Sequence, residues 1–144
     1  MREYLQVTAG RYKVLVDARQ VQAVVALPAD VWARGHTLWR GRILPLIDLA
    51  RILGEKPASD CPRESCALVM DDFTGHSGIL APSHVGPLVC LDEETLHPLP
   101  GGLPDSVADW FDGVAVNEEG VPGALCLKVG VALSRAEDGG ESQP

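Results

Sequence analysis

The chain has 144 residues, of which 46% are hydrophobic, so it suits one domain with a sizeable core and excludes wholesale disorder. Its net charge of −8 and its scattered Lys and Arg residues disfavour a nucleic-acid binder, which needs a basic face. No segment approaches the roughly 18 apolar residues of a membrane span. The amino-terminal segment also lacks the apolar region of a signal peptide, so we expect a cytoplasmic protein without direct membrane insertion.

The amino-terminal segments predict a β-hairpin. Residues 3–10 and 12–18 both have strand-like patterns and are separated by turn residues. Strict alternation in the first strand places Leu5 and Val7 on one face and Tyr4 on the other.

Two further strands and a short helix follow. Residues 21–28 are rich in valine and predict a third strand. Residues 41–49 predict a fourth, in which Pro45 cannot donate a ladder hydrogen bond. This strand is therefore an edge strand, a bulge or a strand that bends between sheets. Asp48 is a candidate N-cap for a helix that Gly54 ends.

The second half of the chain is also dominated by strands. Residues 65–72 predict one strand and residues 79–92 predict one or two. Residues 105–114 suit a short helix, whereas 123–133 suit a strand that a short helix could follow. About nine short strands separated by turn residues favour an all-β barrel or sandwich.

The chain offers few groups for catalysis. Its histidines have no paired spacing, and three of its cysteines lie in apolar runs, where we expect buried small hydrophobes in a reducing compartment. These residues are His36, His76, His84, His97, Cys61, Cys66, Cys90 and Cys126. No nucleophile elbow, P-loop or zinc pattern is present. We therefore predict no catalytic residue, no cofactor and no metal, and keep a small β-barrel enzyme or metal protein as the less favoured alternative.

The stretch "TLWRGRILPLIDLARILG", residues 37–54, is the most distinctive. It resembles the signature of the CheW-like domain family, in which a leucine, an arginine and a glycine lead into an aliphatic run with an internal proline and a terminal Asp-Leu. The matching residues are Leu38, Arg40, Gly41, Leu44, Pro45, Asp48 and Leu49, with Trp39 inserted into the Leu-Arg-Gly step. The resemblance extends over about residues 3–135, and its flanks are less specific than its centre.

This resemblance implies a mostly β fold. Two small SH3-like five-stranded β-barrel subdomains would surround a shared hydrophobic core, with short helices at the joins. Residues 1–135 would form a single CheW-like domain of two β subdomains. The polar composition of 136–144 predicts a disordered tail.

The resemblance also implies a non-enzymatic adaptor of chemotaxis-type signalling. Its partners would be the cytoplasmic tip of a chemoreceptor, the regulatory domain of a CheA-like histidine kinase and other CheW-like proteins. We expect it in the cytoplasm, associated with membrane-bound receptor arrays. The alternative is an auxiliary CheW-like adaptor of a pili, surface-sensing or developmental pathway that binds only the kinase or another adaptor.

The central motif supplies half of the candidate partner-binding residues. In the family, the arginine that Arg40 matches lies near the receptor-binding surface, and a guanidinium suits a helix carboxylate. The alternative for Arg40 is an internal salt bridge to Asp48. Gly41 would permit a backbone turn. Trp39 is either a core plug or a partner-facing anchor, and the sequence does not choose.

The third predicted strand supplies the remaining candidates. Val24, Val25 and Leu27 would line the wall of a groove that receives a receptor helix. The alternative for all three is the plain hydrophobic core, because β-branched and aliphatic residues fill interiors.

Overall fold

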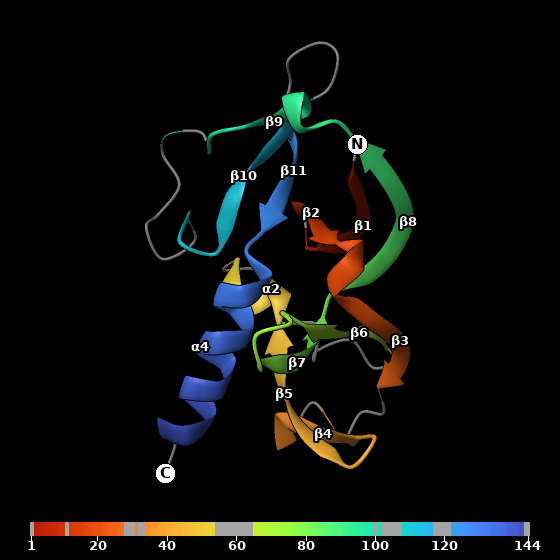
Figure 1. The fold of residues 1–144 in the computed structure, drawn as a ribbon, viewed down its shortest axis with the longest axis vertical. Helices are drawn as coiled ribbons and strands as arrows, with labels where there is room; N and C mark the ends of the chain where they lie inside the picture. Colours follow the sequence, from red (N-terminus) through yellow and green to blue (C-terminus); the bar gives the residue numbers. More distant parts are fainter. Residues whose placement is uncertain are drawn as a thin grey trace.

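The computed structural model describes residues 2–10, 12–27, 31, 34–53, 65–99, 101, 108–116 and 122–142. Two β-sheets follow one another along the long axis of the molecule, and a carboxy-terminal helix lies beside them (Figure 1). The elements are β1 (Arg2–Ala9), β2 (Tyr12–Asp17), η1 (Ala18–Gln20), β3 (Val21–Leu27), β4 (His36–Trp39), β5 (Arg42–Asp48), α2 (Leu49–Ile52), β6 (Ser65–Asp71), β7 (Ser77–Ala81), β8 (His84–Leu91), η3 (Glu93–Thr95), β9 (Leu96–His97), β10 (Phe111–Val116), β11 (Pro122–Leu127) and α4 (Val129–Ser142).

The first sheet has six strands in the order β8-β1-β2-β11-β10-β9 and curls into a half-barrel. β1 and β2 form the antiparallel hairpin that the sequence predicts. Three successive residues of β2 are buried. Val14 and Val16 enter the main core, which is the hydrophobic cluster shared by the two sheets, whereas Leu15 faces the inside of the half-barrel. A central strand covered on both faces therefore carries a continuous apolar run instead of an alternating one.

The second sheet has five strands in the order β3-β6-β7-β5-β4. β5 changes partners along its length: His36 of β4 pairs with Pro45, whereas Leu46 of β5 pairs in parallel with Ile79 of β7. Pro45 lies at this change, where the missing amide hydrogen leaves no ladder position unsatisfied. Pro45 therefore marks a change of partner within one sheet, whereas an edge strand, a bulge or a strand that bends between sheets was predicted.

One hydrophobic cluster joins the two sheets and the helix α4. It contains side chains from β1, β2, β5, α2, β6, β7, β10, β11 and α4, with Phe111 and Leu68 among its most buried members. A smaller cluster around Leu44 fills the second sheet, and another around Leu15 fills the half-barrel. The predicted shared core is thus present, and each sheet also has a small core of its own.

The first strand alternates as predicted. Leu5 and Val7 contact the main core, whereas Tyr4 lies on the opposite face and enters the half-barrel. β1 pairs with β2 without a register shift. Its pairing with β8 shifts register between Leu5 and Val7, and the extra residue lies on β8, between Val85 and Leu88.

Three details differ from the sequence predictions. The sheets have six and five strands instead of five each, because the two-residue β9 adds to β10. β4 was not predicted, since its four residues lie in a run with turn-like flanks. Residues 111–114 belong to β10 instead of the predicted helix 105–114, whose residues 105–107 lie outside the described ranges. Pairing with β11 overrides the local helical pattern there.

The carboxy-terminal segment differs from the disordered tail predicted for 136–144. The backbone of α4 continues to Ser142, and only residues 143 and 144 lie outside the description at this end. Val129, Ala132 and Leu133 are buried in the main core. Once this packed first turn exists, each added residue costs little to place in the helix. In the described ranges, no helix has the length and apolar character to cross a membrane.

Candidate protein-interaction surface

The family-like motif folds into the β4–β5 hairpin, which occupies the end of the long axis opposite β9 (Figure 1). Arg40 and Gly41 form its two-residue turn, with φ values of 48° and 77°. Positive φ at both central residues is the pattern of a type I′ turn, whose twist matches the flanking strands. Gly41 therefore permits the turn, as predicted, because glycine adopts this conformation without a Cβ clash.

Trp39 and Arg40 form a stacked pair beside this turn. The guanidinium carbon of Arg40 lies 4.6 Å from the ring centroid of Trp39. The indole is half-buried and packs against the cluster around Leu44. Trp39 pairs in register with Arg42, so it occupies a regular strand position and causes no bulge. The indole is thus a partial core plug that also positions the Arg40 cation.

The structure decides against a salt bridge between Arg40 and Asp48. They lie at opposite ends of β5, so a seven-residue strand separates them by about 20 Å. Asp48 precedes α2 but makes no side-chain capping bond, and within the described part of the chain its buried Oδ1 accepts no hydrogen bond. Arg40 remains exposed at the hairpin tip and is available to a partner.

The three predicted groove residues of β3 have different environments. Val24 is 53% exposed, Val25 is half-buried against the cluster around Leu44, and Leu27 is only 2% exposed. Successive residues of a strand face opposite sides, so the three cannot form one wall. Leu27 belongs to the core, the alternative that its aliphatic character allowed, and Val24 alone offers a largely exposed surface.

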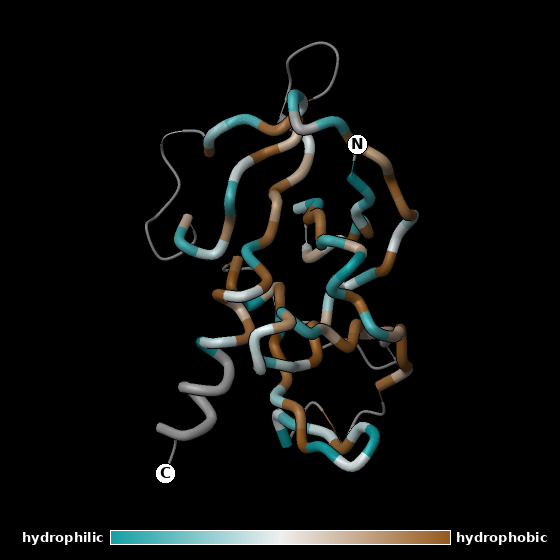
Figure 2. Tube along the Cα trace, viewed as in Figure 1, coloured by the Kyte–Doolittle hydropathy of each residue, from teal (hydrophilic) through white to brown (hydrophobic). Residues whose placement is uncertain are grey.

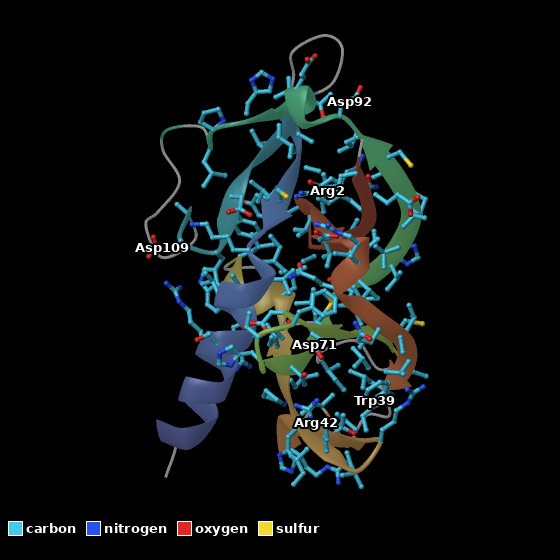
Figure 3. All side chains as sticks on the ribbon, viewed as in Figure 1. Arg2, Trp39, Arg42, Asp71, Asp92 and Asp109 are labelled. Atoms are coloured by element: carbon cyan, nitrogen blue, oxygen red, sulfur yellow. The ribbon has the colours of Figure 1, made fainter. Side chains whose placement is uncertain are left out.

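Three exposed residues of the hairpin were not among the predicted candidates. Leu38 and Ile43 are 68% and 72% exposed and are Cα partners across the two strands. Arg42 is also exposed, and Figure 3 labels it together with Trp39 on this hairpin. The strand assignment of β4 would have revealed Leu38, because alternation from the half-buried Trp39 places Leu38 on the outer face. Arg42 and Ile43 lie in the strand predicted for 41–49, whose outer face was not identified.

Apart from the hairpin, a concave region lies at the half-barrel. A cavity of about 500 Å³ has charged and polar side chains on its wall, including Arg2, Tyr4, Asp17, Asp112, Cys126 and Lys128. Burial, reinforced by the charge of Asp112, raises the pKa of the Cys126 thiol to about 11, and a hydrogen bond from Tyr4 only partly offsets this. A thiol so rarely ionised is a poor nucleophile.

Asp17, which lines this cavity, forms an ion pair with Arg19. The guanidinium Nη2 of Arg19 lies 2.9 Å from Oδ2 of Asp17, and the Arg19 amide donates to Oδ1 over 3.0 Å. Burial opposes ionisation of Asp17, but these hydrogen bonds hold its carboxyl pKa below the usual value. The carboxylate is already bonded within its own loop and caps η1.

The titratable groups of the described residues do not gather into a metal site. Among the residues that the structure describes, no three His, Cys, Asp or Glu side chains lie close enough together to hold an ion. The prediction of buried cysteines is wrong for Cys66 and Cys90, which are exposed, and right for Cys126. The exposed pair lie on outward positions of β6 and β8, opposite Ala26 and Glu3. Cys61 lies outside the described residues.

Two sheets around a shared core, with an exposed hairpin at one end, define a mostly β domain whose most distinctive surface is that hairpin. The family model of the CheW-like domain matches residues 3–136, so the chain belongs to the CheW-like domain family. Among solved structures, the chain is similar to the scaffolding protein TtCheW from Thermoanaerobacter tengcongensis. The TM-score is 0.68 at 18% identity, over 88% of each chain. No curated protein sequence matches it.

These comparisons support the fold and a general role. The likeness to TtCheW shows the fold, which includes two SH3-like subdomains. Family membership supports an adaptor or scaffold role.

Proposed function

We propose that this protein is a non-enzymatic adaptor of chemotaxis-type signalling that couples a methyl-accepting receptor to a CheA-like histidine kinase. Its partners are the cytoplasmic tip of the receptor, the regulatory domain of the kinase and other CheW-like proteins. It works in the cytoplasm at membrane-bound receptor arrays. The single observation that carries the proposal is the family match over residues 3–136, whose central motif forms the exposed β4–β5 hairpin.

The proposed mechanism is scaffolding. The exposed Arg40, held over Trp39 by the turn at Gly41, pairs with a carboxylate of a receptor helix. Val24, the largely exposed residue of β3, contributes an apolar contact to a partner. One domain that binds both proteins holds them in register, so a receptor movement that changes the preferred arrangement biases the kinase equilibrium.

The test is a pair of separate titrations of the purified chain, one with a receptor-tip fragment and one with the regulatory domain of the kinase. We expect both to bind, and Arg40→Glu to weaken at least one by about tenfold, since it replaces an attraction by a repulsion. The matched control is Arg51→Glu, which reverses an exposed arginine on α2. Its binding should stay unchanged.

Each result of the titrations decides between the roles. Binding to the kinase but not the receptor favours the auxiliary adaptor. Failure of both partners to bind the intact chain overturns the adaptor role. Normal binding by Arg40→Glu, with the fold intact, overturns the role of Arg40.

A further inference from the structure

The concave side of the half-barrel holds a cavity that plays no part in the proposed adaptor role. Its volume of about 500 Å³ lies in the range in which proteins bind small molecules. Tyr4 and Cys126 form part of its wall and are only 3% and 6% exposed. Leu96 and Val131 add aliphatic surface to the wall. The cavity therefore offers apolar contacts to the body of a small molecule.

Asp112 joins this wall through an irregularity of β10. Phe111 pairs with Leu127 and Gly113 pairs with Cys126, so the register leaves Asp112 as the extra residue of a β-bulge. A bulge re-aims a side chain, and Asp112 here lines the cavity. Burial is the main cause of the raised pKa of the Cys126 thiol, and the charge of Asp112 adds to it. The carboxylate therefore lies within electrostatic range of that buried thiol.

Lys128 brings the opposite charge to the same wall. The preceding residues of the two strands, Phe111 and Leu127, both enter the main core, so Asp112 and Lys128 face away from that core. Because Phe111 pairs with Leu127 in antiparallel strands, the two charged residues are diagonal neighbours, about 7–8 Å apart between their backbones. Figure 2 shows the hydrophobic course of β11 giving way to a hydrophilic position just before α4.

Neither of these two charges is neutralised within the described part of the chain. Asp112 and Lys128 form no ion pair with each other or with another described residue. The other charged residues of the wall are already engaged: Asp17 pairs with Arg19, and Arg2 interacts with a phenol of the same wall. A singly charged ligand would satisfy only one of the two free charges, whereas a zwitterion satisfies both.

We propose that the half-barrel cavity binds a small zwitterion with an apolar body, whose cationic group pairs with Asp112 and whose carboxylate pairs with Lys128. The apolar body lies against the aliphatic wall at Leu96 and Val131. A peptide of two or three apolar residues with free ends has this chemistry. It also spans the separation of the two charges, since each extended residue covers about 3.3–3.6 Å. The proposal goes beyond the adaptor role and does not depend on it.

The test titrates the ¹⁵N-labelled full chain with dileucine and follows the backbone amide chemical shifts. Three related peptides each lack one feature of the proposed ligand. Acetyl-dileucine lacks the cationic amino group, dileucine amide lacks the carboxylate, and diglycine lacks the apolar body. We expect dileucine to bind more tightly than all three and to shift amides of residues 111–113 and 126–131.

Two variants test the assignment of each charge. Asp112→Asn should weaken dileucine binding about fivefold, the upper range for an exposed ion pair. It should also abolish the preference for dileucine over acetyl-dileucine, because no carboxylate remains to distinguish them. Lys128→Gln should likewise abolish the preference over dileucine amide. The matched controls Asp92→Asn and Lys13→Gln remove the charges of exposed residues outside the cavity wall and should leave binding unchanged.

Three outcomes overturn the proposal: dileucine fails to bind at the cavity, any of the related peptides binds as tightly as dileucine, or the variants keep both preferences. Asp112 and Lys128 take no part in the hydrophobic cores, so both variants should fold. If one does not fold, the comparison of the four peptides on the unaltered chain still decides between a zwitterion and a singly charged ligand.

Discussion

Two aliphatic segments of this chain have opposite environments. In β2, Val14, Leu15 and Val16 are at most 1% exposed, whereas in the β4–β5 hairpin Leu38 and Ile43 are 68% and 72% exposed. The two segments differ in what covers them. β2 lies between β1 and β11 and has a core on each face, whereas the hairpin ends at the edge strand β4 and has a core on one face only. Aliphatic residues thus stabilise the fold in one region and remain exposed to solvent in the other.

The largest effect should come from the buried segment. Leu15→Ala removes a side chain that is 1% exposed in the half-barrel, and we expect a loss of about 2–5 kcal/mol in the free energy of unfolding. Chemical denaturation followed by circular dichroism measures it. A loss below about 1 kcal/mol would mean that the half-barrel interior is not a packed core.

Substitution in the turn that joins β4 to β5 should have an intermediate effect on the free energy of unfolding. A Cβ on Gly41 would meet no atom within 4 Å, but the φ of +77° disfavours any other residue. We expect Gly41→Ala to cost about 1–2 kcal/mol in the free energy of unfolding through the backbone alone. Gly101→Ala is the control, because that site is equally open and has no such φ. Equal stability of both variants would contradict the turn geometry.

The cysteines should show the same contrast between buried and exposed positions in their reactivity. The pKa of about 11 leaves the Cys126 thiol almost entirely protonated at pH 8, so exposed Cys66 and Cys90 should react with iodoacetamide first. Peptide mass mapping identifies the order. Early modification of Cys126 in the folded protein would contradict its burial.

Cys126 also predicts a dependence of stability on pH. Its pKa is higher in the folded protein than the ordinary value of 9.0, so folding disfavours the thiolate. Its contribution is fully present below about pH 9 and is lost as the pH rises through about 11. Cys126→Ser should flatten the fall in denaturation midpoint over this window. An unchanged profile in Cys126→Ser would assign the fall to other groups.

The smallest effect on stability should come from the exposed residues Leu38 and Ile43. Leu38→Ser and Ile43→Ser should each change the free energy of unfolding by less than about 0.5 kcal/mol, because these side chains already contact water. The same denaturation assay measures it. A cost above about 1.5 kcal/mol would show that the outer face of the hairpin contributes to folding and would remove the contrast with β2.

Much of the fold was accessible from local patterns. The β1–β2 hairpin followed from two strand-like runs around a turn, and an irregularity at Pro45 was expected from its missing amide hydrogen, although the change of partner within one sheet was not predicted. Other features needed long-range pairing. Pairing of Phe111–Val116 with β11 overrode the helical pattern of 105–114, and the burial of both Tyr4 and Val7 required a core on each face of β1.

The candidate surface also has some features that the local sequence predicts and others that it does not. The positive-φ turn at Arg40 and Gly41 was indicated by the Arg-Gly step itself, because glycine tolerates that conformation. The core position of Leu27 was not distinguished from surface, since an aliphatic strand residue suits either. The exposed face of Leu38 was not predicted, because its strand β4 was not recognised.

The sequence by itself determined the mostly β class, the family and the turn that carries Arg40, because alternation, turn residues and a dense motif are local properties. Only the tertiary structure decided which aliphatic residues are covered. Burial depends on which strands and helices pack on each face, and that packing joins residues far apart in the chain. The same residue types therefore form the core at β2 and an exposed face at Leu38 and Ile43.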